Sequence, residues 1–230
     1  MFKVCVLFLL ILAPSLQDFV NISSRARLVN GNQYIAKIIQ DTFSEIEERG
    51  FCNLKLYDFN QTLNESMYNW NVTGHVEYTN GFLHTINRIR VHSISSSLST
   101  STITGISAAN FGATVEFSPA VVGYDVAAHL DDGVHHFTGT YRHPEIRYTL
   151  HLSKNLNTGQ MSATSILAST GSSTGLRMIY MPESRVSEVL SRRFSPSTFD
   201  SASDWGKNII VPLILEKAQT TEFPKITFVN

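Results

Sequence analysis

The chain of 230 residues is poor in charge. Asp, Glu, Lys and Arg together make up 16% of it, and the formal net charge is -1. An average soluble domain holds about a quarter charged residues. No run of basic residues occurs anywhere along the chain. Nucleic-acid binding and polybasic membrane docking both need clustered Lys and Arg, so we expect neither.

Cysteine is almost missing, with only Cys5 and Cys52. Cys5 lies in a short apolar stretch that follows one lysine and precedes small residues. This layout is typical of a cleaved secretory signal, and the stretch is too short to cross a bilayer. We therefore expect a signal peptide over 1–17, one mature domain over 18–230, secretion to the extracellular space and no transmembrane anchor. Cys52, alone in the mature chain, would be buried, paired with another chain or a reactive thiol.

Catalytic motifs are also missing. The run G-S-S-T-G around Ser173 matches a nucleophile elbow, but an α/β-hydrolase needs a histidine after that serine, and the last histidine is His151. None of the eight histidines forms a His-Glu-x-x-His motif, and one mature cysteine cannot build a thiolate metal site. The one histidine group worth inspecting is His129 with Asp131, across a turn from His135. We expect no enzyme activity, no metal and no cofactor.

What the chain does carry begins with four N-glycosylation sequons in its first third. Each has the form Asn-x-Ser or Asn-x-Thr, which is the acceptor pattern in secreted proteins. The sequons therefore predict a glycoprotein whose early segment is exposed, with glycans on Asn21, Asn60, Asn64 and Asn71.

Hydrophobic periodicity divides the chain into helical ends and a middle of strands. Residues 30–49 show one apolar stripe at helical spacing, with Gly50 as a stop signal. The end of the chain returns to this period over about 186–194 and again over 198–218, where Pro212 should introduce a kink.

Between these ends, apolar and polar residues alternate from Trp70 to Tyr180. Links of hairpin length predict a meandering antiparallel sheet with one buried face. Asn80-Gly81 is the strongest hairpin signal in the chain and predicts a two-residue loop there. The Ser- and Thr-rich stretch 93–104 is compatible with either a loose linker or an edge strand.

These patterns predict an α+β fold, in which one long curved antiparallel sheet wraps around an N-terminal and a C-terminal amphipathic helix. Such an elongated roll encloses more apolar space than two helices fill. We expect this space to hold a lipid or other hydrophobic ligand against the apolar stripes of Ile35, Ile39, Phe43, Val122, Tyr124, Val126, Leu150, Leu152, Leu167, Leu190, Ile209 and Leu213.

Several segments resemble the group 7 mite allergens and their arthropod relatives. They are Gly74 to Phe82, Phe117 to Leu130, Glu145 to Ser165 with its central turn, and the closing helix from Trp205 to Ala218. The resemblance implies a tubular lipid-binding fold shared with juvenile-hormone-binding, takeout-like and bactericidal permeability-increasing proteins. The hormone-binding relatives typically carry a disulfide near the N-terminus, which this chain lacks.

Two functions follow as expectations. The first is a secreted, allergen-like glycoprotein that binds or carries a lipid or other hydrophobic ligand. The alternative is a secreted surface-interaction or immune-recognition protein of the same fold with no bound ligand, which predicts an exposed apolar patch at one end.

Overall fold

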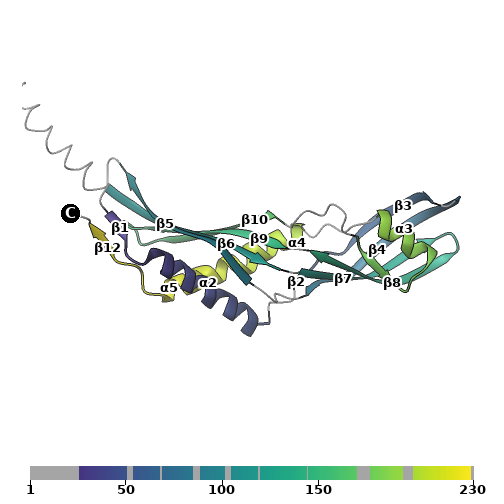
Figure 1. Cartoon of the computed structure of the whole chain (residues 1–230), viewed down its shortest axis with the longest axis horizontal. Coiled ribbons are helices and arrows are strands. Elements are labelled where there is room, and N and C mark those ends of the chain that lie inside the picture. Colours follow the sequence, from purple (N-terminus) through teal and green to yellow (C-terminus); the bar gives the residue numbers. More distant parts are fainter. Residues whose placement is uncertain are drawn as a thin grey trace, which may run out of the picture.

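The computed structural model describes residues 26–50, 54–67, 69–84, 89–101, 105–118, 120–143, 145–169, 177–193 and 199–228. The expected signal peptide, Asn21, Cys52 and Ser173 lie outside these residues. Figure 1 shows an elongated, curved molecule with two successive sheets along its length. Among the described residues, none of the helices combines the length and the hydropathy that a bilayer-spanning segment needs.

The first sheet has four antiparallel strands in the order β10-β9-β6-β5. Its neighbouring strands pair in long ladders, so that Phe111 of β6 faces Leu152 of β9 and Ile94 of β5 faces Ala113 of β6. The Ser- and Thr-rich stretch is therefore an edge strand over most of its length and not a linker. The strands are β5 (Ile89–Ser101), β6 (Gly105–Phe117), β9 (Ile146–Asn155) and β10 (Met161–Ser169).

The second sheet has six strands, with the path β11-β8-β7-β4-β2 and β3 paired to β4. Its inner face carries buried aromatic and branched side chains, whereas its outer face is polar. The strands are β2 (Leu54–Lys55), β3 (Phe59–Met67), β4 (Trp70–His84), β7 (Ala120–Leu130), β8 (Gly133–His143) and β11 (Ile179–Met181). A separate pair joins β1 (Ala26–Leu28) to β12 (Ile226–Phe228) near the two ends of the described chain.

The helices α2 (Gly31–Glu48) and α5 (Val211–Thr220) lie side by side against the four-stranded sheet. The predicted N-terminal helix is confirmed, and Gly50 follows it with a φ of 71°. The stripe Tyr34, Ile35, Ile38, Ile39, Phe43 and Ile46 is buried because these positions recur at helical spacing on one face.

The expected C-terminal helix consists of α4 (Phe199–Trp205), a π-helical turn η1 (Gly206–Ile210) and α5. At the end of η1 the Val211 N–H donates to the Gly206 carbonyl, five residues back. Pro212 follows at the start of α5, where its missing N–H is tolerated. In place of the predicted kink at Pro212, the helix has a π-helical turn shortly before this proline.

The fold expectation is correct in class and needs one correction in arrangement. The antiparallel meander and the two helical ends are present, but the strands form two successive sheets instead of one. Helices α2 and α5 pack on the four-stranded sheet, and another helix, α3 (Arg185–Arg193), packs on β11 at the far end.

The hairpin predicted at Asn80-Gly81 is wrong. β4 continues through these residues, which form a bulge where two residues of β4 stand opposite Tyr124 of β7. Gly81 lies so close to the Tyr124 ring that an added Cβ would come within 2.2 Å of it. The tight turn is instead between Met67 and Trp70, with Asn69 at a φ of 60°. Asn80 has a left-handed backbone with a φ of 52°, a conformation that suits both a turn and a bulge, and tertiary packing selected the bulge.

Candidate functional site

The two sheets meet around a small enclosed pocket. Its volume is about 10 Å³, roughly the space of one water molecule. Its walls come from β2, β4, β6, β7, β9 and α4, namely Leu54, Leu83, Phe117, Ala120, Ile146, Tyr148, Ala202 and Trp205.

The strand ends bring these residues together. Phe117 is the last residue of β6, Ala120 the first of β7 and Ile146 the first of β9. At these positions the chain leaves one sheet and enters the other, so the inner faces of both sheets point toward one space. The helix α4 closes this space, since it contacts both β2 and β10.

Three aromatic rings form the centre of the wall. The centroids of Phe117 and Trp205 are 5.7 Å apart, and Tyr148 lies 5.7 Å from Phe117 and 5.9 Å from Trp205. The Tyr148 hydroxyl donates to the Ala202 carbonyl at 2.7 Å, and burial raises the pKa of Tyr148 above its ordinary value. The Tyr148 hydroxyl is therefore neutral and donates its hydrogen bond to a carbonyl of α4. The part of Tyr148 that faces the pocket is mainly the carbon atoms of its ring.

One polar atom of the wall is unsatisfied. Trp205 Nε1 is buried and has no hydrogen-bond partner among the described residues. A buried donor without a partner costs about 1–3 kcal/mol. The indole N–H is thus available to any acceptor oxygen that reaches it.

The helix α4 is attached to its surroundings by a few contacts. Besides the Tyr148 bond, the Tyr57 backbone N–H donates to Ser201 Oγ at 3.1 Å and the Tyr57 hydroxyl bonds to Asp204. The π turn that follows α4 is a local irregularity of a type that is frequent at functional sites.

The twelve residues predicted to line a ligand site separate into two groups. Eight lie at the helical end: Ile35, Ile39 and Phe43 on α2, Leu150 and Leu152 on β9, Leu167 on β10, Ile209 on η1 and Leu213 on α5. Four lie beyond the junction: Val122, Tyr124 and Val126 on β7 and Leu190 on α3.

Both groups belong to one hydrophobic cluster, with Leu167 and Ile209 only partly buried. None of the twelve is among the walls of the enclosed pocket. Sequence reasoning missed Phe117, Tyr148 and Trp205 as wall residues. All three lie in the apolar stripes. The usable signal was the position of Phe117 and Tyr148 at or near strand ends and of Trp205 at the end of α4.

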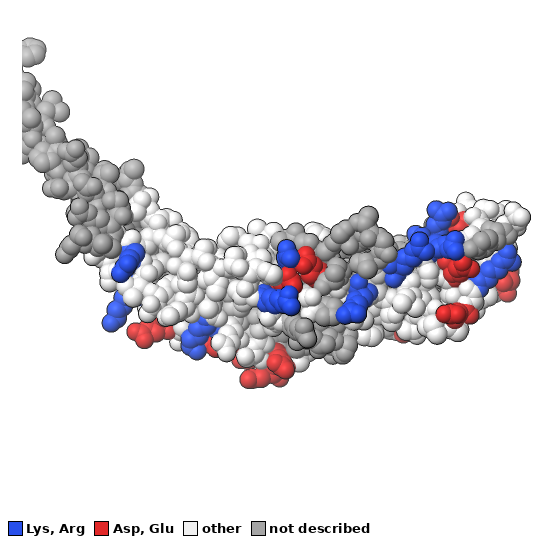
Figure 2. Space-filling model, viewed as in Figure 1, with Lys and Arg blue, Asp and Glu red and all other residues white. Residues whose placement is uncertain are grey.

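Two open grooves of about 790 Å³ each lie near opposite ends of the molecule. One runs between β11 and α3 and combines the exposed Ile179 with Arg177, Arg185 and Arg192. Figure 2 shows Lys and Arg gathered toward this end, with few charges over the four-stranded sheet. The other groove lies between α2 and residues 220–225 and includes the aromatic rings of Tyr34 and Phe223.

The described sequons share one surface. Asn60, Asn64 and Asn71 are all exposed on the outer face of the β3–β4 hairpin. Asn64 stands opposite Thr73, and Asn71 stands opposite Ser66, so each asparagine faces a hydroxyl of a neighbouring sequon. A glycan on any of them would project into solvent from this face.

The histidine group singled out from the sequence does not form. His129 pairs with Val134 and His135 pairs with Ala128, so their side chains lie on opposite faces of the sheet. His135 instead contacts Asp132 at 2.9 Å, and Asp131 accepts a hydrogen bond from Thr73 at 3.1 Å.

Comparison with known proteins gives little sequence similarity. No family model and no curated protein sequence matches the chain. A crystal structure of a lipopolysaccharide binding protein matches with a TM-score of 0.45 and 10% sequence identity, over 83% of this chain and 39% of that one. The chain thus spans well under half the length of that structure.

Proposed function

We propose that this chain is a secreted, N-glycosylated, non-catalytic protein that binds a lipid or another hydrophobic small molecule. The observation that carries the proposal is the enclosed pocket between the sheets, whose walls are apolar except for one unsatisfied donor, Trp205 Nε1. An amphiphile with a hydrocarbon body and one acceptor oxygen complements this site.

The walls must separate before a ligand enters, because about 10 Å³ holds no hydrocarbon chain. Burial of each methylene contributes about 0.8 kcal/mol, whereas a neutral hydrogen bond contributes a net of about 0.5–1.5 kcal/mol and one to a carboxylate, as between Tyr57 and Asp204, about 1.5–3 kcal/mol. A few methylenes therefore offset the loss of the contacts of α4 with Tyr148 and Tyr57. We propose that α4 moves away from the junction and that the chain lies along the apolar stripes on either side.

The test uses the secreted protein, analysed first by native mass spectrometry with organic extraction. We expect a co-purifying lipid, and the delipidated protein should take up palmitate at one equivalent. Trp205→Phe removes the indole N–H and keeps a large ring, so palmitate affinity should fall about fivefold, the equivalent of one net hydrogen bond.

Trp70→Phe is the matched control, because Trp70 lies on β4 against Arg185 of α3 and not in the pocket. Its palmitate affinity should equal that of the parent protein. An apo mass with no uptake of palmitate would contradict the proposal.

A second candidate function rests on the exposed side chains of β11. Ile179 is 63% exposed and lines the α3 groove beside its arginines, and Met181, two residues further along β11, is 54% exposed. This patch supports the surface-interaction alternative, in which the protein docks through its α3 end with no bound ligand. Ile179→Asp should abolish such docking and leave palmitate uptake unchanged, which separates the two functions.

A further inference from the structure

The outer face of the six-stranded sheet brings together two histidines and a carboxylate. His75 and Glu77 are two residues apart on β4, so both point outward, and His129 is the direct partner of His75 on β7. The imidazole rings are parallel, with centroids 4.3 Å apart and an angle of 4° between them.

Both rings direct the same nitrogen toward one carboxylate. His75 Nε2 lies 3.5 Å from Glu77 Oε1, and His129 Nε2 lies 3.4 Å from Glu77 Oε2. One donor atom from each of the three residues can be chosen so that all lie within 4.8 Å of one another. Ligands about 2.0–2.1 Å from a tetrahedral zinc ion stand roughly 3.3 Å apart, which is close to both nitrogen–oxygen separations. These separations involve the two different oxygens of Glu77, and an imidazole nitrogen binds a metal in the plane of its ring, so one of the two parallel rings must rotate before both nitrogens face one ion.

The contacts among His75, Glu77 and His129 leave one ring nitrogen without a hydrogen-bond partner among the described residues. His129 Nε2 is buried and makes no hydrogen bond with any described residue, although its ring lies beside the Glu77 carboxylate. The three side chains are 33–52% exposed, so solvent reaches the group as a whole, while His129 Nε2 itself is covered. A cation between the three donors would supply the partner that Nε2 lacks.

We propose that His75, Glu77 and His129 form a divalent transition-metal site, with Zn²⁺ as the ion of choice. Two imidazole nitrogens and one carboxylate oxygen suit Zn²⁺, whereas Ca²⁺ and Mg²⁺ prefer sites made only of oxygen. Three protein ligands leave a fourth position for water or for a donor from another molecule. Because the ligands come from neighbouring strands, the ion would also join β4 to β7.

The site is independent of the apolar pocket. Its residues lie on the outer face, and Glu77 stands opposite Asn60, the first of the described sequons. Ligand binding at the junction and metal binding here can therefore succeed or fail separately.

The test is calorimetric titration with Zn²⁺ of the secreted protein, purified without a histidine tag and dialysed against a chelator. It should be run with and without enzymatic removal of N-glycans. We expect one equivalent of Zn²⁺ to bind, and neither Ca²⁺ nor Mg²⁺. His75→Ala, Glu77→Gln and His129→Ala should each weaken binding more than about tenfold, since even the loss of an indirect contact at a metal site costs 10–100-fold.

His136→Ala is the matched control. His136 is exposed on β8 on the same outer face, opposite Ala127, and does not belong to the three-residue group. Its Zn²⁺ affinity should match that of the parent, and thermal unfolding without metal verifies that each variant folds. The proposal is overturned if Zn²⁺ does not bind at one equivalent, or if the three ligand variants bind it as tightly as the control.

Discussion

In the half of the molecule built on β5, β6, β9 and β10, the helices α2 and α5 cover the inner face of the sheet. In the half built on β2, β3, β4, β7, β8 and β11, the nine-residue helix α3 packs on β11, and α4 contacts the short strand β2. We call these the helical half and the tyrosine half.

The tyrosine half fills its interior with aromatic side chains of its own strands. Tyr78 stacks on Phe59 at 4.4 Å, Tyr124 packs edge-on against both rings, and the hydroxyls of Tyr78 and Tyr180 share a hydrogen bond of 2.8 Å. A sheet with little helical cover can therefore still bury its inner face when large aromatic rings replace the helix. The cost is that polar hydroxyls enter the interior and must find partners.

The largest expected effects come from removing alkyl groups in each half. Ile38 of α2 and Leu190 of α3 are both fully buried, so Ile38→Ala and Leu190→Ala should each cost about 2–5 kcal/mol. Urea unfolding followed by the fluorescence of Trp205 and Trp70 would locate the loss. We expect Ile38→Ala to shift the Trp205 transition most, and Leu190→Ala to shift the Trp70 transition, since α3 packs beside that ring.

Single-tryptophan versions made with Trp70→Phe or Trp205→Phe provide the reporters for this experiment. If both transitions shift together in both variants, the halves unfold as one unit and the comparison does not extend to stability.

The two halves should also differ in the alkaline pH at which they lose stability. Burial raises the pKa of Tyr78 and of Tyr124 to about 12 and also raises that of Tyr180. A raised tyrosine pKa stabilises the fold fully below the unfolded value of about 10, and this contribution is lost as pH rises toward 12. The helical half has two such tyrosines, Tyr34 and Tyr148.

We therefore expect the Trp70 signal to change at lower pH than the Trp205 signal in an alkaline titration, with tyrosinate absorbance recorded in parallel. The double variant Tyr78→Phe/Tyr180→Phe should move the Trp70 change to higher pH. Identical midpoints for the two reporters would argue against a tyrosine-dependent difference.

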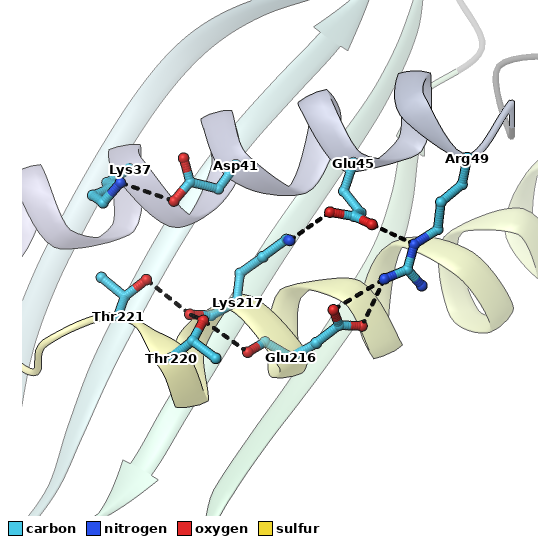
Figure 3. Close-up of polar contacts among 8 residues, drawn as sticks. All are labelled: Lys37, Asp41, Glu45, Arg49, Glu216, Lys217, Thr220 and Thr221. Atoms are coloured by element: carbon cyan, nitrogen blue, oxygen red, sulfur yellow. Dashed lines mark hydrogen bonds and ion pairs between the residues drawn. The ribbon is translucent and has the colours of Figure 1, made fainter.

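The smallest effect concerns the ion-pair network of the helical half. Figure 3 shows Glu45 of α2 between Lys217 of α5 and Arg49, which in turn contacts Glu216. The pKa of Glu45 is lowered mainly by the hydrogen bond from Lys217 and secondly by the hydrogen bond from Arg49. The ionised Glu45 carboxylate therefore stabilises the fold at neutral pH, and this stabilisation is lost on acidification.

Glu45→Gln should lower the melting temperature slightly at low salt and by less at high salt, because salt screens the half-exposed Arg49 pair more than the part-buried Lys217 pair. The control is Glu47→Gln on the same helix, whose carboxylate is exposed and outside the network drawn in Figure 3. A loss of equal size at high salt would mean that packing, and not charge, connects these helices.

Much of the fold was predictable from local patterns. The stripe of α2 and the stop at Gly50 were predicted correctly, since each depends on residues close in sequence. The Asn80-Gly81 hairpin failed because the same backbone preference serves a turn and a bulge. The choice depended on Tyr124, which is distant in sequence and adjacent in space.

The candidate sites were less predictable. Alternation along β4 and β7 indicated which side chains face outward, but only the register pairs His75 with His129 above Glu77. The pocket likewise needs strand ends from two sheets and the position of Trp205, none of which follows from a stripe.

By itself, the sequence determined the helical ends, the alternation along most strands, the buried faces and the low charge, because these depend on residue type and on spacing of two or 3.6 residues. Only the tertiary structure decided that the strands divide into two sheets, that a pocket lies where they meet, and that two histidines share one carboxylate. Those features depend on the pairing of distant segments, whose energies depend on how the whole chain packs.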